Sequence, residues 1–502
     1  MKKIVSIFAI MACAVSLQAQ NAVQKYIEQL KTTDELKESV WGVKAVRLDG
    51  TKVAEYNSAI RMLPASNTKL ITTGLTLNEL GPDFKFKTRI AHSGEIIDGI
   101  LKGDLYIVGG ADPTIGANDS VSVALQTTFS NWAAVLKKAG IKGIEGRVIG
   151  DGRYVDGEYQ NLSWQIEDGY CGDGTGMTGL SFYENLQNVR VTPGKTVGAP
   201  VKVEPVFPET PWVSWNNTCV TAPKGEGDDL YYACTSLAPV ASMSGTLALD
   251  QSQKRVTCAN SFGAMTCAFY FYRYLEGIGI LAENGPADID PLGRIRDFDD
   301  ASEDNEAALG WDKLTFIGDY SSPSLKDIIR QTNHVSDNFY AETLLRTLSK
   351  EKTGSTCYDS CAVAENRALK KIGVKLSDRV QIKDGSGLAR KNYISPDFFV
   401  EFLTAMHSTP VFDDYLHSLP QPGKYGTLSS RMASAPADVK TRVYMKSGSL
   451  NGVRCFSGYI LPSSGKAEDT IVFSVMTNNT IATTSRINFI MDKIIGLIAA
   501  EN

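Results

Sequence analysis

Three short polar motifs, widely separated along the chain, hold residues that together could catalyse acyl transfer. Ser66 and Lys69 form a Ser-x-x-Lys motif, Ser336 and Asn338 belong to a Ser-Asp-Asn motif, and Lys446 begins a Lys-Ser-Gly motif. A serine hydroxyl can attack a carbonyl carbon when an amine takes its proton, and burial with a nearby cation lowers the pKa of a lysine enough for that role. The motifs therefore predict a serine nucleophile with a lysine base, and no metal ion or cofactor is needed.

The first two motifs suit the elements on which we expect them. Ser66 opens an amphipathic helix, which places Lys69 on the same side of its first turn. Ser336 and Asn338 fall in a break between two helical stretches, where the hydroxyl could relay a proton to a leaving amine and the amide could hold substrate and Lys69. A helix N-cap is the ordinary alternative for each motif when it stands alone.

The third motif is predicted to end a strand and to supply binding groups. Lys446 adds positive charge, Gly448 leaves room for a substrate at the strand edge, and the hydroxyls of Ser447 and Ser449 can bind a carboxylate. The backbone N–H groups of Ser66 and Ser449 would form an oxyanion hole. Alone this motif is a common turn, so the prediction depends on all three motifs occurring in order.

The composition is that of an ordinary globular protein of more than one domain. The 502 residues are 43% hydrophobic and carry a formal net charge of -5 without a long block of one sign, so nucleic acid is not an expected partner. Residues 1–19 read as a cleavable secretory signal, with Lys2 and Lys3 before an apolar run and Ala19 at the cleavage site. Cys13 lies inside that run, which argues against lipidation. We expect an exported, periplasmic protein, and peripheral membrane contact is left open.

Eight cysteines remain after the signal, an even number that permits disulfides in an exported protein. The neighbouring pairs Cys219 with Cys234 and Cys258 with Cys267 could close hairpins. Free, buried thiols are the alternative, especially for Cys455 in an apolar strand. A zinc site is disfavoured because the chain has only four histidines and no Cys-x-x-Cys spacing.

The two ends of the chain are predicted to form one α+β domain on an antiparallel sheet. Asp49-Gly50 joins two alternating runs between residues 41 and 57, which indicates a hairpin. Helices over 66–80 and 324–349 would pack beside the sheet. The remaining predicted elements are a charged helix over 21–40, strands over 439–445, 453–461 and 471–477, and a helix over 486–500.

The middle of the chain is different in character. Residues 83–309 contain short β-like runs, many Gly and Pro, and one clear helix at 133–139. The acidic segment 297–306 is a natural linker. We therefore predict a discontinuous catalytic domain over 20–82 and 310–502, with a large, mainly β insertion that forms additional, smaller domains.

At these residues the chain resembles the penicillin-binding protein 4 type D-alanyl-D-alanine carboxypeptidase/endopeptidases, the low-molecular-mass class C group of peptidase family S13. Further strings that carry the resemblance are Gly109–Thr114, Tyr183–Gly194 and Asp384–Arg390. In that family an insertion between the first two motifs forms two additional domains, and the interval of about 270 residues between Ser66 and Ser336 matches this pattern. Such an interval disfavours a class A β-lactamase.

The resemblance implies an exported serine hydrolase with a penicillin-binding transpeptidase-like fold. Its substrates would be peptidoglycan stem peptides and cross-links, cleaved through an acyl-enzyme on Ser66, and β-lactam antibiotics would be covalent inhibitors. Ser447 stands where the family usually has threonine, a change that keeps the hydroxyl. A β-lactamase or esterase on the same scaffold and a non-catalytic peptidoglycan-binding protein are the alternatives. The oligomeric state is left open.

Four further residues are candidate substrate contacts by the same resemblance. Asp168, with Glu167 as the alternative, lies in a segment whose aspartate in relatives meets the free amine of the diamino acid. Arg390 and Asn451 are weaker candidates. Tyr183–Asn185 imitates the Tyr-x-Asn motif of class C β-lactamases, but its place before a β-like run favours a structural role.

Overall fold

The computed structural model describes residues 21–297, 306–375 and 380–501, and the chain divides into two compact units. Unit 1 comprises Met1–Asn67, Tyr393–His407 and Pro420–Asn502, and unit 2 comprises Thr68–Asn392 and Ser408–Leu419. The predicted signal and most of the predicted linker lie outside the described residues. The predicted domain limits stay a prediction.

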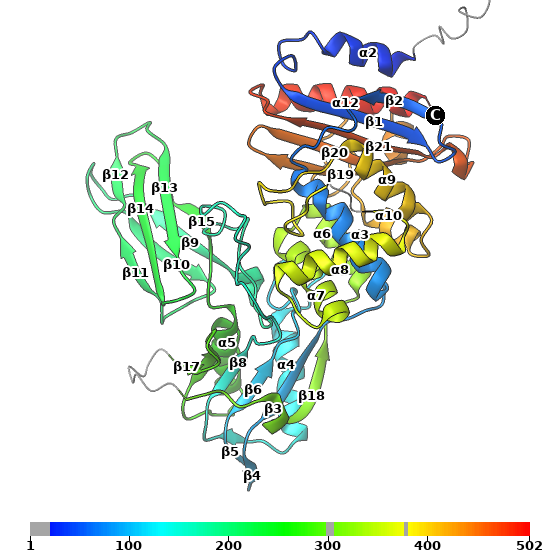
Figure 1. Cartoon of the computed structure of the whole chain (residues 1–502). Helices are drawn as coiled ribbons and strands as arrows, with labels where there is room; N and C mark the ends of the chain where they lie inside the picture. Colours follow the sequence, from blue (N-terminus) through cyan, green and yellow to red (C-terminus); the bar gives the residue numbers. More distant parts are fainter. Residues whose placement is uncertain (1–20, 298–305, 376–379, 502) are drawn as a thin grey trace, which may run out of the picture. The chain divides into compact units, whose positions relative to one another are not determined.

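Unit 1 is built on a five-stranded antiparallel sheet with the strand order β19-β20-β21-β1-β2 (Figure 1). The first and last parts of the chain meet where β1 pairs with β21 along its whole length. This confirms the prediction that strands from both ends form one sheet. The strands are β1 Val40–Arg47, β2 Lys52–Tyr56, β19 Val443–Leu450, β20 Val453–Ile460 and β21 Ile471–Asn478.

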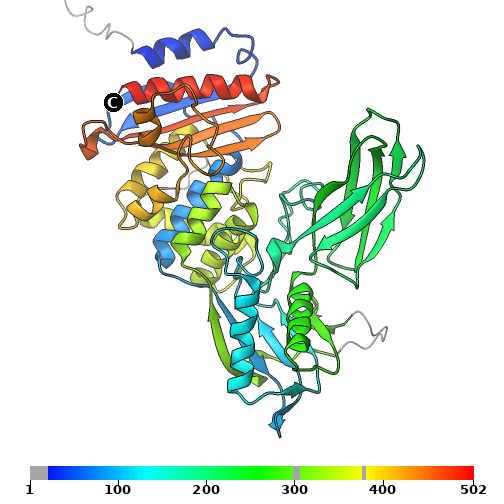
Figure 2. The same ribbon diagram turned by 180° about the vertical axis from the view of Figure 1, so that it is seen from behind.

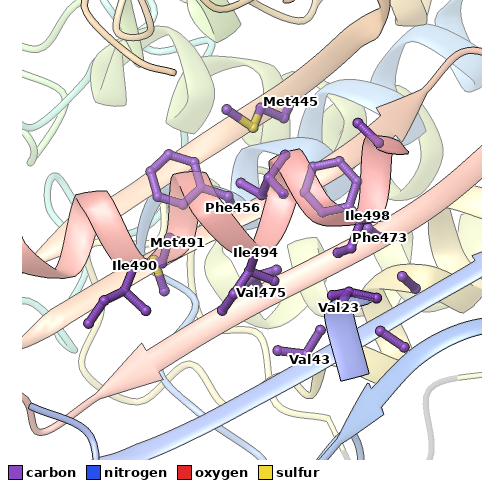
Figure 3. Packing of buried hydrophobic residues seen from close by; sticks show 14 of the residues in the cluster. Val23, Val43, Met445, Phe456, Phe473, Val475, Ile490, Met491, Ile494 and Ile498 are labelled. Atoms are coloured by element: carbon purple, nitrogen blue, oxygen red, sulfur yellow. The ribbon is translucent and has the colours of Figure 1, made fainter. Parts of the chain in front are cut away.

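Helices cover both faces of this sheet. The last helix, α12 (Thr484–Ala500), runs along one face, where Ile494 and Ile498 point toward strand residues such as Phe473 (Figures 2 and 3). Helix α9 (Pro396–His407) covers the other face, since Lys44, whose neighbours along β1 point toward α12, pairs with Asp397 of α9. No helix among the described residues is long and apolar enough to cross a membrane.

Two predicted boundaries in unit 1 are wrong. The first helix, α2 (Ala22–Leu30), ends well before residue 40, because the hydroxyls of Thr32 and Thr33 donate to backbone carbonyls and compete with the helix. Strand β19 begins at Val443, after the short helix α11 (Ala437–Arg442), and continues to Leu450. The Lys-Ser-Gly motif therefore lies inside a strand and does not end one.

Close packing fixes β19 against η1 (Ala65–Asn67), the short turn that carries Ser66. A Cβ atom on Gly448 would lie 2.6 Å from the carbonyl oxygen of Pro64 and 3.0 Å from the backbone nitrogen of Asn67. The side chain of Asn67 also donates to Ser457 Oγ of β20 at 2.8 Å. Only glycine at position 448 lets the turn approach the strand so closely.

Unit 2 contains a helical cluster and two β regions. Helix α3 directly follows η1 and is buried along most of its length among the other helices. The break between α6 and α7 at the Ser-Asp-Asn motif is as predicted. The helices are α3 Thr68–Leu80, α6 Leu325–Val335, α7 Asn338–Thr353, α8 Tyr358–Lys371 and α10 Phe412–Ser418.

The first β region is a six-stranded mixed sheet in the order β17-β16-β8-β6-β3-β18. Two helices, α4 (Leu125–Lys138) and α5 (Gly263–Gly277), share a hydrophobic cluster with it. The first half of α5 is buried all round, so it lacks the periodic polar face that would have predicted a helix there. The strands are β3 Lys87–His92, β6 Leu105–Val108, β8 Val148–Asp151, β16 Pro286–Ile289, β17 Ile295–Arg296 and β18 Thr315–Ser321.

The second β region consists of two small sheets, β10-β9-β15 and β11-β14-β12 with β13, which share one apolar cluster. Of the two possibilities left open, the structure has the free thiols, since all eight described cysteines are unpaired with one another. Cys258 lies opposite Cys171 in a β-bridge, whereas Cys267 is buried on α5. The strands are β9 Leu186–Thr192, β10 Lys202–Phe207, β11 Ser214–Asn217, β12 Val220–Ala222, β13 Asp228–Cys234, β14 Val240–Ala248 and β15 Lys254–Ala259.

Removing a core side chain of α12 should destabilise unit 1 strongly. Ile494 is 1% exposed in the cluster between α12 and the sheet. We expect Ile494→Ala to lower the free energy of unfolding by about 2–5 kcal/mol, because it leaves a cavity. Phe489→Ala on the same helix, where the ring is 56% exposed, should cost less than about 1 kcal/mol. Urea denaturation measures both, and equal losses would contradict the packing described.

Adding one methyl group at Gly448 should disturb the Ser66 turn. Its Cβ would meet backbone atoms of Pro64 and Asn67, so we expect Gly448→Ala to destabilise the fold by about 1–3 kcal/mol. Gly496→Ala is the matched control, because its Cβ would meet nothing within 4 Å and the change should stabilise α12 by about 0.4–1 kcal/mol. Thermal unfolding of the two variants should therefore shift in opposite directions.

Candidate active site

Ser66 lies in a strained turn of unit 1. It is partly exposed in η1, and the residue before it, Ala65, has a φ of 47°, in the left-handed region. Such a conformation costs roughly 1–2 kcal/mol in a residue with a Cβ and persists only where the surroundings hold it. The contacts of Asn67 and Gly448 described above hold this turn. The strained backbone thus presents the predicted nucleophile.

The residues of the third motif lie on β19 of unit 1 with contrasting exposure. The side chain of Lys446 is fully buried, and its Nζ donates to the backbone oxygen of Ser447 at 2.9 Å. The hydroxyl of Ser447 donates to Thr427 Oγ1 at 3.2 Å, and Ser449 is exposed. Asn451 is exposed in the turn between β19 and β20. This strand therefore offers a buried lysine amine and hydroxyl groups that solvent can reach.

The Ser-Asp-Asn motif of unit 2 joins two helices through a second left-handed residue. Ser336 caps the C-terminus of α6 with a φ of 66°. Asp337 caps the N-terminus of α7, where its Oδ1 accepts the backbone N–H of Tyr340 at 2.8 Å. The capping role expected as an alternative is thus present. It fixes the orientation of the residues on both sides of Asp337.

Lys69 of α3 is a buried lysine of unit 2 whose amine is held by two acceptors. Its side chain is fully buried, and its Nζ donates to Asn338 Oδ1 at 2.6 Å and to the backbone oxygen of Ser386 at 2.7 Å. Burial lowers the pKa of Lys69 to about 8. Four acidic side chains oppose this shift: Asp384, Asp337, Glu342 and Asp173.

Asn338 and the backbone of Ser386 accept two N–H bonds of the Lys69 amine, and an amine that has lost its extra proton still has two N–H bonds to donate. The amide of Asn338 is oriented for this contact, because its Nδ2 donates to the backbone oxygen of Asp173 at 2.8 Å. Near neutral pH a lysine with a pKa of about 8 can lose and regain a proton readily.

The buried carboxyl groups of Glu342 and Asp384 bind the backbone around Ser386, whose carbonyl oxygen accepts a hydrogen bond from Lys69. Glu342 Oε1 accepts the N–H of Ser386 at 2.7 Å, and burial raises the pKa of Glu342 to about 7. Asp384 accepts the N–H groups of Gly387 and Ala389 at 3.0 and 2.6 Å. Asp384 belongs to a string that carried the family resemblance, but sequence reasoning assigned neither acid a role. The partner of Glu342 lies 44 residues away in the sequence, too far to be recognised from spacing, whereas these backbone partners of Asp384 are only three and five residues away.

A loop before the second β region approaches the same residues. Trp164 Nε1 donates to Asp384 Oδ2 at 2.9 Å, and Arg390 Nε donates to Gln165 Oε1 at 3.1 Å. Asp168 is half-buried, which raises its pKa, while the charge of Arg390 opposes the rise. The structure therefore brings two of the candidate substrate contacts, Asp168 and Arg390, into one neighbourhood of unit 2. No group of three or more His, Cys, Asp or Glu in the described residues could hold a metal ion.

Tyr183–Asn185 forms the short turn η2 directly before β9, as a structural role predicts. That interpretation is incomplete, however. The side chain of Glu184 hydrogen-bonds to the carboxyl group of Asp337 in the second motif. Nothing in the local sequence indicates this contact, because the two residues meet only through the fold.

Comparison with known proteins gives consistent results. The chain is 27% identical over 446 residues to a D-alanyl-D-alanine carboxypeptidase of an Actinomadura species, covering 86% of this chain and 76% of that protein. It is 27% identical over 473 residues to the penicillin-sensitive carboxypeptidase A of Dictyostelium discoideum, with 89% and 84% coverage. The crystal structure of penicillin-binding protein 4 from Haemophilus influenzae matches with a TM-score of 0.77 at 21% identity, covering 96% and 98% of the two chains.

The predicted fold, an α+β domain with a large insertion that forms additional domains, is thus confirmed by the match to the Haemophilus influenzae structure. The model of one protein family matches residues 23–284 and 312–500, which is most of the chain and includes all three motifs. The chain therefore belongs to the D-Ala-D-Ala carboxypeptidase 3 (S13) family of peptidases.

Proposed function

We propose that this protein is an exported serine D-Ala-D-Ala carboxypeptidase and endopeptidase that trims and opens peptidoglycan peptides. The observation that carries the proposal is the buried Lys69 amine, which has a lowered pKa and donates to Asn338 and Ser386. A base of that kind, three residues after a serine in a strained turn, suits serine acyl transfer. Family membership supports the D-Ala-D-Ala substrate.

The proposed reaction begins when Ser66 Oγ attacks the carbonyl carbon of the penultimate D-alanine. The hydroxyl proton passes to the Lys69 amine as the C–O bond forms. The C–N bond then breaks, and the leaving amine takes a proton relayed by Ser336 with Lys446. Water attacks the resulting ester, which releases the shortened peptide and restores the serine.

The same proposal assigns the groups that bind the substrate. Ser447 and Ser449 hold the terminal carboxylate, and the backbone N–H groups of Ser66 and Ser449 stabilise the oxyanion. Asp168 meets the amine of the diamino acid. Arg390 and Asn451 are the weaker contacts in this scheme.

Penicillin should label the serine, because opening of its ring would leave an acyl group on the same atom. We expect fluorescent penicillin to label the purified protein covalently and Ser66→Ala to abolish labelling. Ser464→Ala, which changes an exposed serine of the β20–β21 loop, is the matched control and should label normally. The Dictyostelium relative is named as penicillin-sensitive, in agreement with this expectation.

Mass spectrometry of muropeptides then separates the activities. Loss of one alanine mass from monomers reports carboxypeptidase action, and splitting of cross-linked dimers reports endopeptidase action. Labelling that survives in Ser66→Ala would refute the nucleophile. Rapid turnover of a chromogenic cephalosporin would indicate a β-lactamase, and unchanged muropeptides would indicate a binding protein.

Acylation should become faster as the pH rises. The base must be neutral, and the Lys69 amine is neutral above its pKa of about 8, so the second-order rate of acylation should increase between about pH 6 and 9 and then level off. Stopped labelling reactions with fluorescent penicillin measure this rate. Lys69→Arg, which stays protonated across this range, should acylate slowly at every pH. A rate that falls with rising pH would contradict the role of Lys69.

A further inference from the structure

The turn at Tyr183–Asn185 is held in an unusual conformation. Three successive residues with Cβ atoms have φ values of 52°, 56° and 53°. Residues other than glycine enter this left-handed region as single residues, not in runs, because the Cβ atom crowds the backbone. A run of three therefore stores strain, which the surroundings must hold.

The surroundings do hold the turn. Asn185 is fully buried, with its Oδ1 accepting the N–H of Phe182 at 3.2 Å and its Nδ2 donating to Gly176 O at 2.8 Å. Its backbone oxygen accepts the N–H of Asn260 at 2.8 Å. A Cβ atom on Gly263 would lie 1.8 Å from Asn185 Oδ1, so this helix start is shaped to fit the turn. These contacts fix the backbone of Glu184 without using its side chain.

The side chain of Glu184 is directed to the second motif. It donates a hydrogen bond to the carboxylate of Asp337, which is possible only when Glu184 carries a proton. Burial raises the pKa of Glu184, and the negative charges of Asp337 and Asp119 raise it further. Burial also raises the pKa of Asp337, but the hydrogen bonds from Tyr340 N–H and Glu184 oppose that rise.

The other charged and titratable groups at this position agree with that assignment. Lys69 favours the ionised form of Asp337 through its positive charge. The hydroxyl of Tyr340, the residue whose N–H caps onto Asp337, donates to Asp119 Oδ2. Two carboxyl groups in hydrogen-bond contact must share a proton, and the N–H that Tyr340 donates to Asp337 favours Glu184 as its carrier.

Asp337 is consequently held from two sides. Its Oδ1 takes the N–H of Tyr340 at 2.8 Å, and Glu184 supplies a second donor from the opposite element. The neighbours of Asp337 along the chain are Ser336, with its left-handed backbone, and Asn338, the partner of Lys69. Any rotation of Asp337 would move both neighbours.

We propose that Glu184 is a positioning residue for acyl transfer: its protonated carboxyl group clamps Asp337 and thereby fixes Ser336 and Asn338 relative to Lys69. The inference rests on the proposed function for its kinetic consequence. A turn with a purely structural role would be less strained with glycine at position 184. A carboxylic acid at this position is explained by the hydrogen bond that it donates.

Four variants test the clamp. Glu184→Ala and Glu184→Gly both remove the donor, and Glu184→Gln keeps a donor in its side-chain amide. Tyr183→Phe is the matched control in the same turn, where only the contact of the hydroxyl with Asn188 Nδ2 is lost. Each variant is measured by its acylation rate with fluorescent penicillin, its melting temperature, and hydrogen exchange of peptides that cover residues 333–342.

We expect Glu184→Ala to acylate about tenfold to a hundredfold more slowly, because a small displacement of catalytic groups has effects of this size. Exchange of the Tyr340 amide should become faster. Glu184→Gly should lose as much activity while melting above the alanine variant, since glycine relieves the strained φ. Glu184→Gln should regain most of the rate, and Tyr183→Phe should behave as wild type.

Two results would overturn the proposal. One is wild-type acylation and wild-type exchange in Glu184→Ala. The other is a rate in all three Glu184 variants that follows the melting temperature alone, with glutamine no better than alanine. If the wild-type protein is not acylated at all, the proposed function fails, and hydrogen exchange still decides whether Glu184 clamps the motif.

Discussion

Burying the amine of Lys69 in unit 2 requires the surrounding groups to satisfy its N–H bonds without tying up its proton permanently. Asn338 and the backbone of Ser386 accept the N–H bonds, and burial keeps the pKa near 8. An uncompensated buried ammonium group would be very unfavourable. A single strongly paired carboxylate would instead hold the proton and abolish basicity. In this site neutral acceptors contact the Lys69 amine directly, and the acidic side chains act on it only through their charge.

The buried acids of unit 2 therefore act mainly on the backbone. Glu342 holds the N–H of Ser386, and Asp384 closes the loop that follows. Asp337 caps α7 while Glu184 shares its proton with it. Each acid fixes the position of a group that touches Lys69, or of a neighbour of such a group. Polar networks of this kind restrict the interior to one arrangement when all of their members have partners.

The three motifs and most strands of unit 1 could be recognised from local patterns such as short spacings, alternation and an Asp-Gly turn, but the start of β19 and the place of the Lys-Ser-Gly motif within it could not. Such patterns also failed for α5, which is buried all round, and for α2, where two threonines end the helix early. The role of Glu184 could not be predicted either. Its partner, Asp337, lies in a distant segment of the chain, and neither periodicity nor spacing in the sequence indicates that the two residues are in contact.

The pairing of β1 with β21 has a consequence for the order of folding. Strand β1 comes from the start of the chain and finds its partner only in Ile471–Asn478, so the sheet has a very high contact order. The turn with Ser66 packs on β19 and β20, which are also synthesised late. The turn that carries Ser66 thus lacks its packing partners until β19 and β20 have been synthesised. A truncated product would lack the scaffold for Ser66 even though it contained that residue.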